Sequence, residues 1–252
     1  MAPSPRRGSS KVAAVWLGLA LACAATASAG GPEVAPKGGQ PQETHATDGA
    51  NDECRARAIR AVQTRYEGIR DLRARFEQTA RPASVGGRGS TETRSKGSVV
   101  VAKPSRMRWT YESPEPSVVV SDGKTLWIYD PSFAEVQRMS VVDGGFLSGA
   151  ALQFLLGRGD MEREFDVRLV SCTASAVELE LLPREPASYE KLRIVADPQT
   201  GNVSRTQIQD LLGNVTIVSF SEVEVNRDPP ASLFHFDPPK GVRVIDLAAP
   251  KP

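Results

Sequence analysis

The chain has 252 residues and a nearly balanced charge, with 31 Lys or Arg against 30 Asp or Glu and a formal net charge of +1 at pH 7. This balance argues against a nucleic-acid partner, because binding to a phosphate backbone requires a strongly basic surface. The sequence lacks a Gly-x-Ser-x-Gly elbow, a phosphate-binding loop and a Cys-x-x-Cys pair. With His45 and His235 alone, it also has no histidine pair, so we predict no catalytic residues, no metal site and no cofactor.

The first 29 residues have the features of a secretory signal peptide. Two arginines at 6–7 and Lys11 precede the apolar stretch 12–25, which is followed at 27–29 by Ala-Ser-Ala, a small-x-small cleavage pattern. The stretch is shorter than the roughly 20 apolar residues that a membrane-spanning helix needs. We therefore predict export of the chain and cleavage after Ala29, which would leave a soluble protein.

Cleavage would also change the charge and the length of the chain. Removing 29 of the 252 residues takes away three positive charges and no negative ones, so the formal charge changes from +1 to −2 and 223 residues remain. A chain of this length can form one β-rich domain. The alternative is lipid modification of Cys23, which follows small residues in the apolar stretch, although Leu21 fits poorly with the small residues that such sites prefer.

The exported chain would keep two cysteines, Cys54 and Cys172, in an oxidising compartment where disulfides persist. We favour a bridge between them, which would close a loop of over a hundred residues and stabilise the fold by restricting the unfolded chain. The alternative is a pair of buried free thiols.

Residues 30–51 are rich in Gly, Pro, Thr and Gln and have almost no large apolar side chain, so we predict a flexible linker. Asp52 is then a plausible N-cap of a helix that ends at Gly68. Its apolar residues recur at intervals of four and form one stripe: Ala58, Val62 and Tyr66.

From Asp71 onward, apolar and polar residues alternate, as in a half-buried strand. The same pattern predicts strands at 97–102, 106–112, 117–121, 124–129, 165–172, 176–183, 190–197, 203–210 and 214–225. The pair Asp122-Gly123 is a strong signal for a two-residue hairpin. We expect His235, between two phenylalanines, to be a packed strand residue. The segment 148–157 is short and unusually apolar, and we predict a helix there.

These elements predict a mainly β fold with an α lid, in one domain at residues 52–247 followed by a short tail at 248–252. Consecutive strands without intervening helices form an antiparallel sheet. A sheet with one apolar face and few covering helices must curl or expose that face. We therefore expect a curled, incomplete antiparallel β-barrel covered by short helices.

Four segments of the sequence resemble the outer-membrane lipoprotein carrier family. They are FEQTA at 76–80, GSVVVAKPSRMRWTYESP at 97–114, VVVSDGKTLWIYDP at 118–131 and FHFDPPKGVRVID at 234–246. The SDGKTLW block is the most specific of the four. The resemblance extends over about residues 54–246.

The resemblance implies a periplasmic protein whose unclosed barrel holds the acyl chains of a lipoprotein in an apolar cavity under helices. It also implies a carrier cycle between the inner and the outer membrane. An ATP-driven transporter in the inner membrane would load the carrier with acylated lipoproteins, and an outer-membrane acceptor of similar shape would unload it. We expect a monomer that is not an enzyme.

We place the cavity at apolar residues that lie near the predicted turns or match the family pattern. Trp109 matches a family tryptophan, and alternation puts its neighbours two residues away on the same side. The predicted cavity residues are Phe76, Met107, Trp109, Tyr111, Leu126, Ile128, Leu152, Phe154, Leu155 and Leu156. Both faces of 126–129 are apolar, so alternation does not decide which one points inward. The alternative for each residue is an ordinary core position.

Lys103 occupies the position of a basic residue that, in the family, bonds to the lid and helps to hold the empty cavity shut. Many relatives have Arg there, which can donate two parallel hydrogen bonds where Lys makes a point contact. The resemblance thus implies that Lys103 is a lid latch that closes more weakly. The alternative is a solvent-facing turn lysine.

Two other functions are compatible with this sequence. A periplasmic lipid-binding lipoprotein would use the same cavity for free lipid, and processing at Cys23 would favour it. A sensor domain of envelope-stress regulation would bind a regulatory partner. Such sensors usually carry a second domain or an anchor, whereas here only a short tail follows the region of resemblance.

Overall fold

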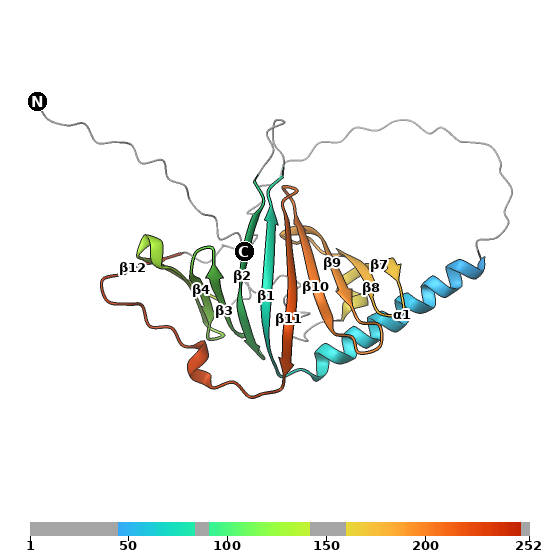
Figure 1. Cartoon of the computed structure of the whole chain (residues 1–252), viewed down its shortest axis with the longest axis horizontal. Helices are drawn as coiled ribbons and strands as arrows, with labels where there is room; N and C mark the ends of the chain where they lie inside the picture. Colours follow the sequence, from blue (N-terminus) through green and yellow to red (C-terminus); the bar gives the residue numbers. More distant parts are fainter. Residues whose placement is uncertain (1–44, 84–90, 142–159, 248–252) are drawn as a thin grey trace, which may run out of the picture.

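The computed structural model describes residues 45–83, 91–141 and 160–247, and their strands form one twelve-stranded sheet (Figure 1). The strands are β1 (Asp71–Arg81), β2 (Thr93–Ala102), β3 (Arg106–Ser113), β4 (Ser117–Ser121), β5 (Thr125–Asp130), β6 (Glu135–Ser140), β7 (Phe165–Cys172), β8 (Val177–Pro183), β9 (Tyr189–Ala196), β10 (Val203–Asp210), β11 (Val215–Val225) and β12 (Arg243–Asp246). Their order across the sheet is β12-β6-β5-β4-β3-β2-β1-β11-β10-β9-β8-β7.

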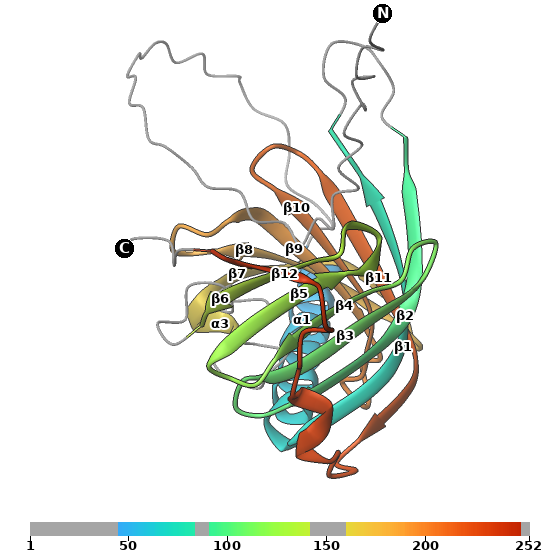
Figure 2. The ribbon, with the colours of Figure 1, turned by 90° about the vertical axis from the view of Figure 1, so that its left-hand side faces the viewer.

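The sheet confirms the predicted fold class. The alternating segments at 117–121, 165–172 and 203–210 are strands with the predicted bounds. Neighbouring strands pair antiparallel from β6 through to β7, whereas β12 pairs with β6 in parallel. The sheet is open, with β12 and β7 at its edges, and Figure 2 shows it curling around the first helix.

The helical elements of the described ranges are α1 (His45–Gly68), α3 (Met161–Glu164) and two short 3-10 segments, η1 (Pro131–Phe133) and η2 (Ala231–Phe234). The N-cap prediction at Asp52 is wrong, because α1 begins at His45 and residues 45–51, assigned to the linker, are helical. The apolar stripe used for that prediction marks only the buried part of the helix, whereas helical hydrogen bonds are local and extend beyond it. None of these helices is long and apolar enough to cross a membrane.

The largest core cluster lies where α1 packs against the β7–β10 half of the concave face. Its residues from α1 are Cys54, Ala58, Ile59, Val62 and Tyr66, and those from the sheet include Val167, Leu179, Leu181, Leu192, Ile194 and Val203. The predicted stripe therefore faces the sheet, and burial of these side chains is what holds the helix in place.

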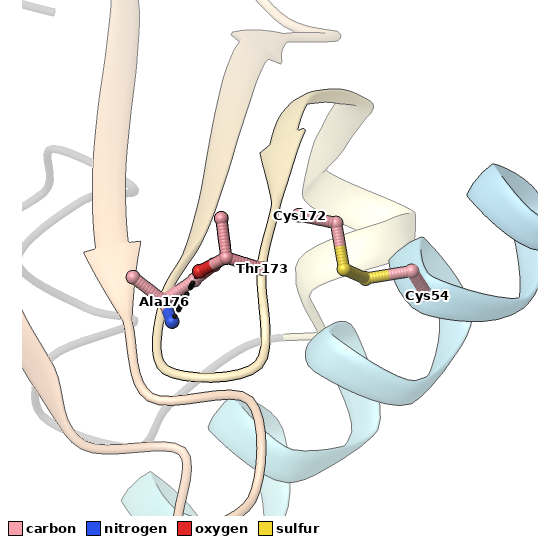
Figure 3. The surroundings of a disulfide bond; sticks show 4 residues. All are labelled: Cys54, Cys172, Thr173 and Ala176. Atoms are coloured by element: carbon pink, nitrogen blue, oxygen red, sulfur yellow. Dashed lines mark hydrogen bonds between the residues drawn. A yellow bond between two sulfur atoms is a disulfide. The ribbon is translucent and has the colours of Figure 1, made fainter.

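A disulfide between Cys54 and Cys172 joins α1 to the edge strand β7, as predicted (Figure 3). The two residues are 118 positions apart in sequence. Directly after Cys172, Thr173 and Ala176 exchange hydrogen bonds that fix the β7–β8 turn, including Thr173 N to Ala176 O at 2.8 Å. The bridge therefore attaches α1 to an ordered hairpin.

The segment after β11 crosses to the convex face of β3–β6. The buried carboxylate of Asp71 accepts hydrogen bonds from the backbone N–H groups of Arg227 and Asp228 and so holds the start of this segment. Phe234 is buried, with the guanidinium of Arg106 5.0 Å from its ring centre. The segment thus covers part of the convex side of β3–β6.

His235 does not have the predicted packed strand position. It follows η2 directly, its side chain is 66% exposed, and its Nε2 lies 3.1 Å from Asp237 Oδ1. Prolines at 229–230 and 238–239 flank the segment and cannot donate ladder hydrogen bonds, which disfavours a strand there.

The disulfide generates a stability prediction. Replacing both Cys54 and Cys172 by Ser should lower the free energy of unfolding by about 2–5 kcal/mol, because the unfolded chain is no longer cross-linked. Urea unfolding of the wild type with and without dithiothreitol, and of the double variant, checks this. Dithiothreitol should shift the midpoint of the wild type alone. Equal midpoints for oxidised wild type and double variant would contradict the prediction.

Candidate functional site

The β1–β6 half of the concave face carries apolar clusters separate from the one under α1. Directly paired residues of an antiparallel sheet point to the same side, so the register identifies which side chains share it. Trp109 pairs with Val119, and Val119 pairs with Ile128. Two residues before Trp109 on β3, Met107 pairs with Ser121, and Ser121 pairs with Leu126. Strands β3, β4 and β5 therefore contribute to one continuous apolar face.

The same face continues onto β1 and β11 through packed aromatic rings. The Phe76 ring centre lies 4.7 Å from that of Trp109 and 5.1 Å from that of Tyr111, the latter in an edge-to-face arrangement. Phe220 of β11 lies edge-to-face with Trp109 at 6.4 Å. Trp109 thus contacts both clusters of this half, one of which includes Leu126 and the other Phe76.

The structure brings together the predicted cavity residues that it describes. They lie on the same side of β1, β3 and β5 and are Phe76, Met107, Trp109, Tyr111, Leu126 and Ile128. The other four, Leu152, Phe154, Leu155 and Leu156, lie outside the described residues, as does the helix predicted at 148–157.

The register also settles the orientation of the strand whose two faces are both apolar. Leu126 and Ile128 point to the concave side with Met107 and Trp109, whereas Trp127 points to the convex side. There the Trp127 ring centre lies 6.5 Å from that of Phe236, in the segment after β11. The second face of β5 is therefore apolar because the segment after β11 packs against it.

Sequence reasoning missed several residues of this concave face. They are Val99, Val101, Val119, Met139 and Phe220, which belong to the same two clusters. Each of them is paired across strands with a predicted residue, and this register is a signal that alternation within a single strand does not give.

Gly97 is required for the aromatic packing. It sits between Phe76 and Tyr111 in the register. A Cβ atom at this position would lie 1.9 Å from Thr110 O and 3.0 Å from a ring carbon of Phe76. A side chain here would therefore force β3 and the Phe76 ring apart.

Tyr111 carries the polar group of this cluster. Its hydroxyl donates a hydrogen bond to Gln78 Oε1 at 3.1 Å. Burial raises the pKa of Tyr111 to about 12, because the phenolate is disfavoured in apolar surroundings. The group is neutral at physiological pH and adds no charge to the face.

Lys103 connects the β2–β3 turn to the end of α1. Its Nζ donates hydrogen bonds to Tyr66 O at 2.8 Å and Glu67 O at 3.1 Å, and its backbone N–H donates to Arg70 O. The last carbonyls of a helix lack helical partners and carry partial negative charge, so an ammonium group stabilises them. Burial lowers the pKa of Lys103, and the carboxylate of Glu67 opposes that shift.

Within the described ranges, no three or more His, Cys, Asp or Glu side chains gather in a way that could hold a metal ion.

The fold and this face together define a class of protein: an open, curled β-sheet with an apolar concave interior, half of it filled by a helix. The chain matches the model of the family described as "Outer membrane lipoprotein carrier protein LolA" over residues 67–237. It is 32% identical over 192 residues to an outer-membrane lipoprotein carrier protein of Nitrosospira multiformis, covering 75% of this chain and 89% of that protein. The chain therefore belongs to the outer-membrane lipoprotein carrier family.

Other relatives and solved structures are also similar. An outer-membrane lipoprotein carrier protein of Nitrosomonas europaea is 30% identical over 192 residues, covering 76% of this chain and 90% of that protein. A crystal structure of an uncharacterized conserved protein from Thermus thermophilus has a TM-score of 0.47 at 13% identity, covering 76% of this chain and 98% of that chain. A LolA superfamily protein from Nitrosomonas europaea has a TM-score of 0.38 at 13% identity, covering 71% and 97%.

The surroundings of Tyr111 predict a pH dependence. The folded pKa lies above the unfolded value of 10.0, so the unfolded chain ionises first and stability is lost as the pH rises from 10 to about 12. One pKa unit corresponds to about 1.4 kcal/mol, so the loss should be on the order of 2–3 kcal/mol. Measuring the free energy of unfolding in urea at several alkaline pH values checks this. The Tyr111→Phe variant is the control, and its free energy of unfolding should fall less over this pH range. Parallel profiles for the two proteins would contradict it.

Proposed function

We propose that this protein binds the acyl chains of lipoproteins on the concave face of β1–β6 and carries them through the periplasm from the inner to the outer membrane. The observation that carries the proposal is the shared orientation of six apolar residues from β1, β3 and β5, apart from the cluster under α1. Membership of the lipoprotein carrier family supports the choice of cargo.

The chemistry of the cargo explains why a carrier is needed. Burying each methylene group contributes about 0.8 kcal/mol, so an acyl chain with about fifteen of them gains on the order of 12 kcal/mol when it leaves water. A free chain in the periplasm would return to a membrane. Release from the carrier requires that part of this gain be offset by the cost of opening the protein.

Lys103 is the residue that we propose as the latch between the β2–β3 turn and α1. Its hydrogen bonds to Tyr66 O and Glu67 O stabilise the arrangement in which this end of α1 is held against the sheet. Opening breaks them, so the latch favours the closed, empty protein. An inner-membrane ATP-driven transporter would supply the energy for loading, and an outer-membrane acceptor would receive the cargo.

The direct test is transfer of a labelled lipoprotein. Purified protein is incubated with spheroplasts that hold a labelled acylated lipoprotein, and soluble material is separated by size. Label in a one-to-one soluble complex is the expected result. If the label stays on the membrane while free phospholipid co-purifies with the protein, the carrier function is contradicted and lipid binding replaces it.

The latch is tested in the same assay with Lys103→Ala. We expect the variant to load but to pass its cargo to outer-membrane vesicles roughly tenfold more slowly, because hydrogen bonds from a charged group contribute about 1.5–3 kcal/mol and their loss favours the open, loaded state. Lys103→Arg should restore transfer, and Lys124→Ala, in the exposed β4–β5 turn, is the control. Equal transfer by Lys103→Ala and the control would contradict the latch.

A further inference from the structure

A groove lies between the outward side of α1 and the β9–β10 turn, with a volume of about 550 Å³. Its lining includes the polar side chains of Arg57, Arg60, Thr64, Arg65, Gln199 and Thr200, together with Ala61 and Gly68. We call it the arginine groove. The residues 57, 60 and 64 are spaced three and four apart, which places them on one side of the helix, and all three are exposed.

The walls of the arginine groove are fixed relative to each other. Asp197 Oδ1 accepts hydrogen bonds from the backbone N–H groups of Gln199 and Thr200, both at 2.8 Å. Gly201 follows with a φ of +69°, and a Cβ atom there would lie 2.2 Å from Ala61 O of α1. The turn thus touches the helix backbone at a point where only glycine fits.

A hydrogen bond between side chains also joins α1 to the β9–β10 turn. Arg65 Nε donates to Asn202 Oδ1 at 2.8 Å, which orients the half-buried guanidinium beside the turn. The geometry of the groove is therefore set by the fold before any ligand enters.

The arginines of the arginine groove form no salt bridge with the acids of the described residues. In the parts of the chain that the structure describes, neither Arg57 nor Arg60 has an ion-pair partner, and Glu53, one turn before Arg57, forms no salt bridge with it. Backbone hydrogen bonds from Thr200 and Gln199 lower the pKa of Asp197 and so favour its charged form, but the carboxylate binds its own turn and forms no ion pair with Arg57 or Arg60 in the described ranges.

Glu67 precedes the lining residue Gly68 but does not itself line the groove. Glu67 Oε1 accepts a hydrogen bond from Gln63 Nε2 at 2.8 Å. The groove therefore combines three guanidinium groups with the hydroxyls of Thr64 and Thr200. Guanidinium groups donate paired hydrogen bonds that match the oxygens of a phosphate, and hydroxyls can donate to the same group.

We propose that the arginine groove is a binding site for a phosphate group. Both a phospholipid headgroup and soluble phosphate would present the required oxygens. The groove lies on the side of α1 that faces away from the sheet, so its ligand does not compete for space with an acyl chain on the concave face. The proposal therefore stands or falls separately from the proposed carrier function.

The test compares three proteins with two phosphate sources. The proteins are the wild type, the double variant Arg57→Gln/Arg60→Gln and the matched control Arg73→Gln/Arg205→Gln, which removes two exposed arginines on β1 and β10. Binding is measured by co-sedimentation with phosphatidylcholine vesicles that do or do not contain phosphatidylglycerol, and by titration with inorganic phosphate followed by NMR. Circular dichroism checks that each variant is folded.

The double variant Arg57→Gln/Arg60→Gln should bind the phosphate source at least about tenfold more weakly than the wild type, while the control Arg73→Gln/Arg205→Gln should bind like the wild type. Binding to phosphatidylglycerol vesicles that inorganic phosphate competes away identifies a lipid headgroup as the source. Saturable binding of inorganic phosphate without vesicle binding identifies soluble phosphate. No binding to either source, or equal loss in the double variant and the control, would overturn the proposal. None of these results depends on whether the protein loads a lipoprotein.

Discussion

The fixed position of α1 on one half of the concave face is the constraint on which the rest of the structure depends. The disulfide joins its N-terminal half to β7, Gly201 touches its C-terminal half at Ala61, and Lys103 binds two carbonyls of its last turn. The apolar stripe of α1 packs on β7–β10. These attachments are cooperative, because each attachment that has formed reduces the conformational entropy that is lost when the next one forms. The helix therefore acts as a wall of the barrel along most of its length.

This division assigns different roles to the two halves of the sheet. On β7–β10, apolar side chains are buried by α1 and stabilise the fold. On β1–β6, the aromatic cluster around Phe76 and Trp109 belongs to a separate group, and the convex side of the same strands is covered by the segment around Phe236. A ligand that replaced contacts on the concave side of β1–β6 would leave both the α1 core and the convex cover intact. Binding and release can then occur without unfolding either one.

Much of this arrangement was predictable because strand alternation and cysteine content are local or compositional signals. They predicted the open antiparallel sheet, the disulfide and the shared side of Met107, Trp109 and Tyr111. They did not predict the start of α1 at His45, because the sequence of residues 45–51 contains no large apolar residue, nor the exposed position of His235. The orientation of β5 required the register of its neighbours. The arginine groove was missed because it joins α1 to a turn more than a hundred residues away, and sequence spacing carries no signal for such contacts.

The central claim is that acyl chains occupy the concave side of β1–β6, and the two tryptophans of the described residues test it directly, since Trp109 lies on that side and Trp127 on the other. The measurement is fluorescence quenching in complexes with a lipoprotein that carries brominated acyl chains, using the exported protein without Trp16 and with either Trp127→Phe or Trp109→Phe. The account predicts strong quenching when Trp109 is the tryptophan that remains and little when it is Trp127. Equal quenching of both, or quenching of Trp127 alone, would contradict it.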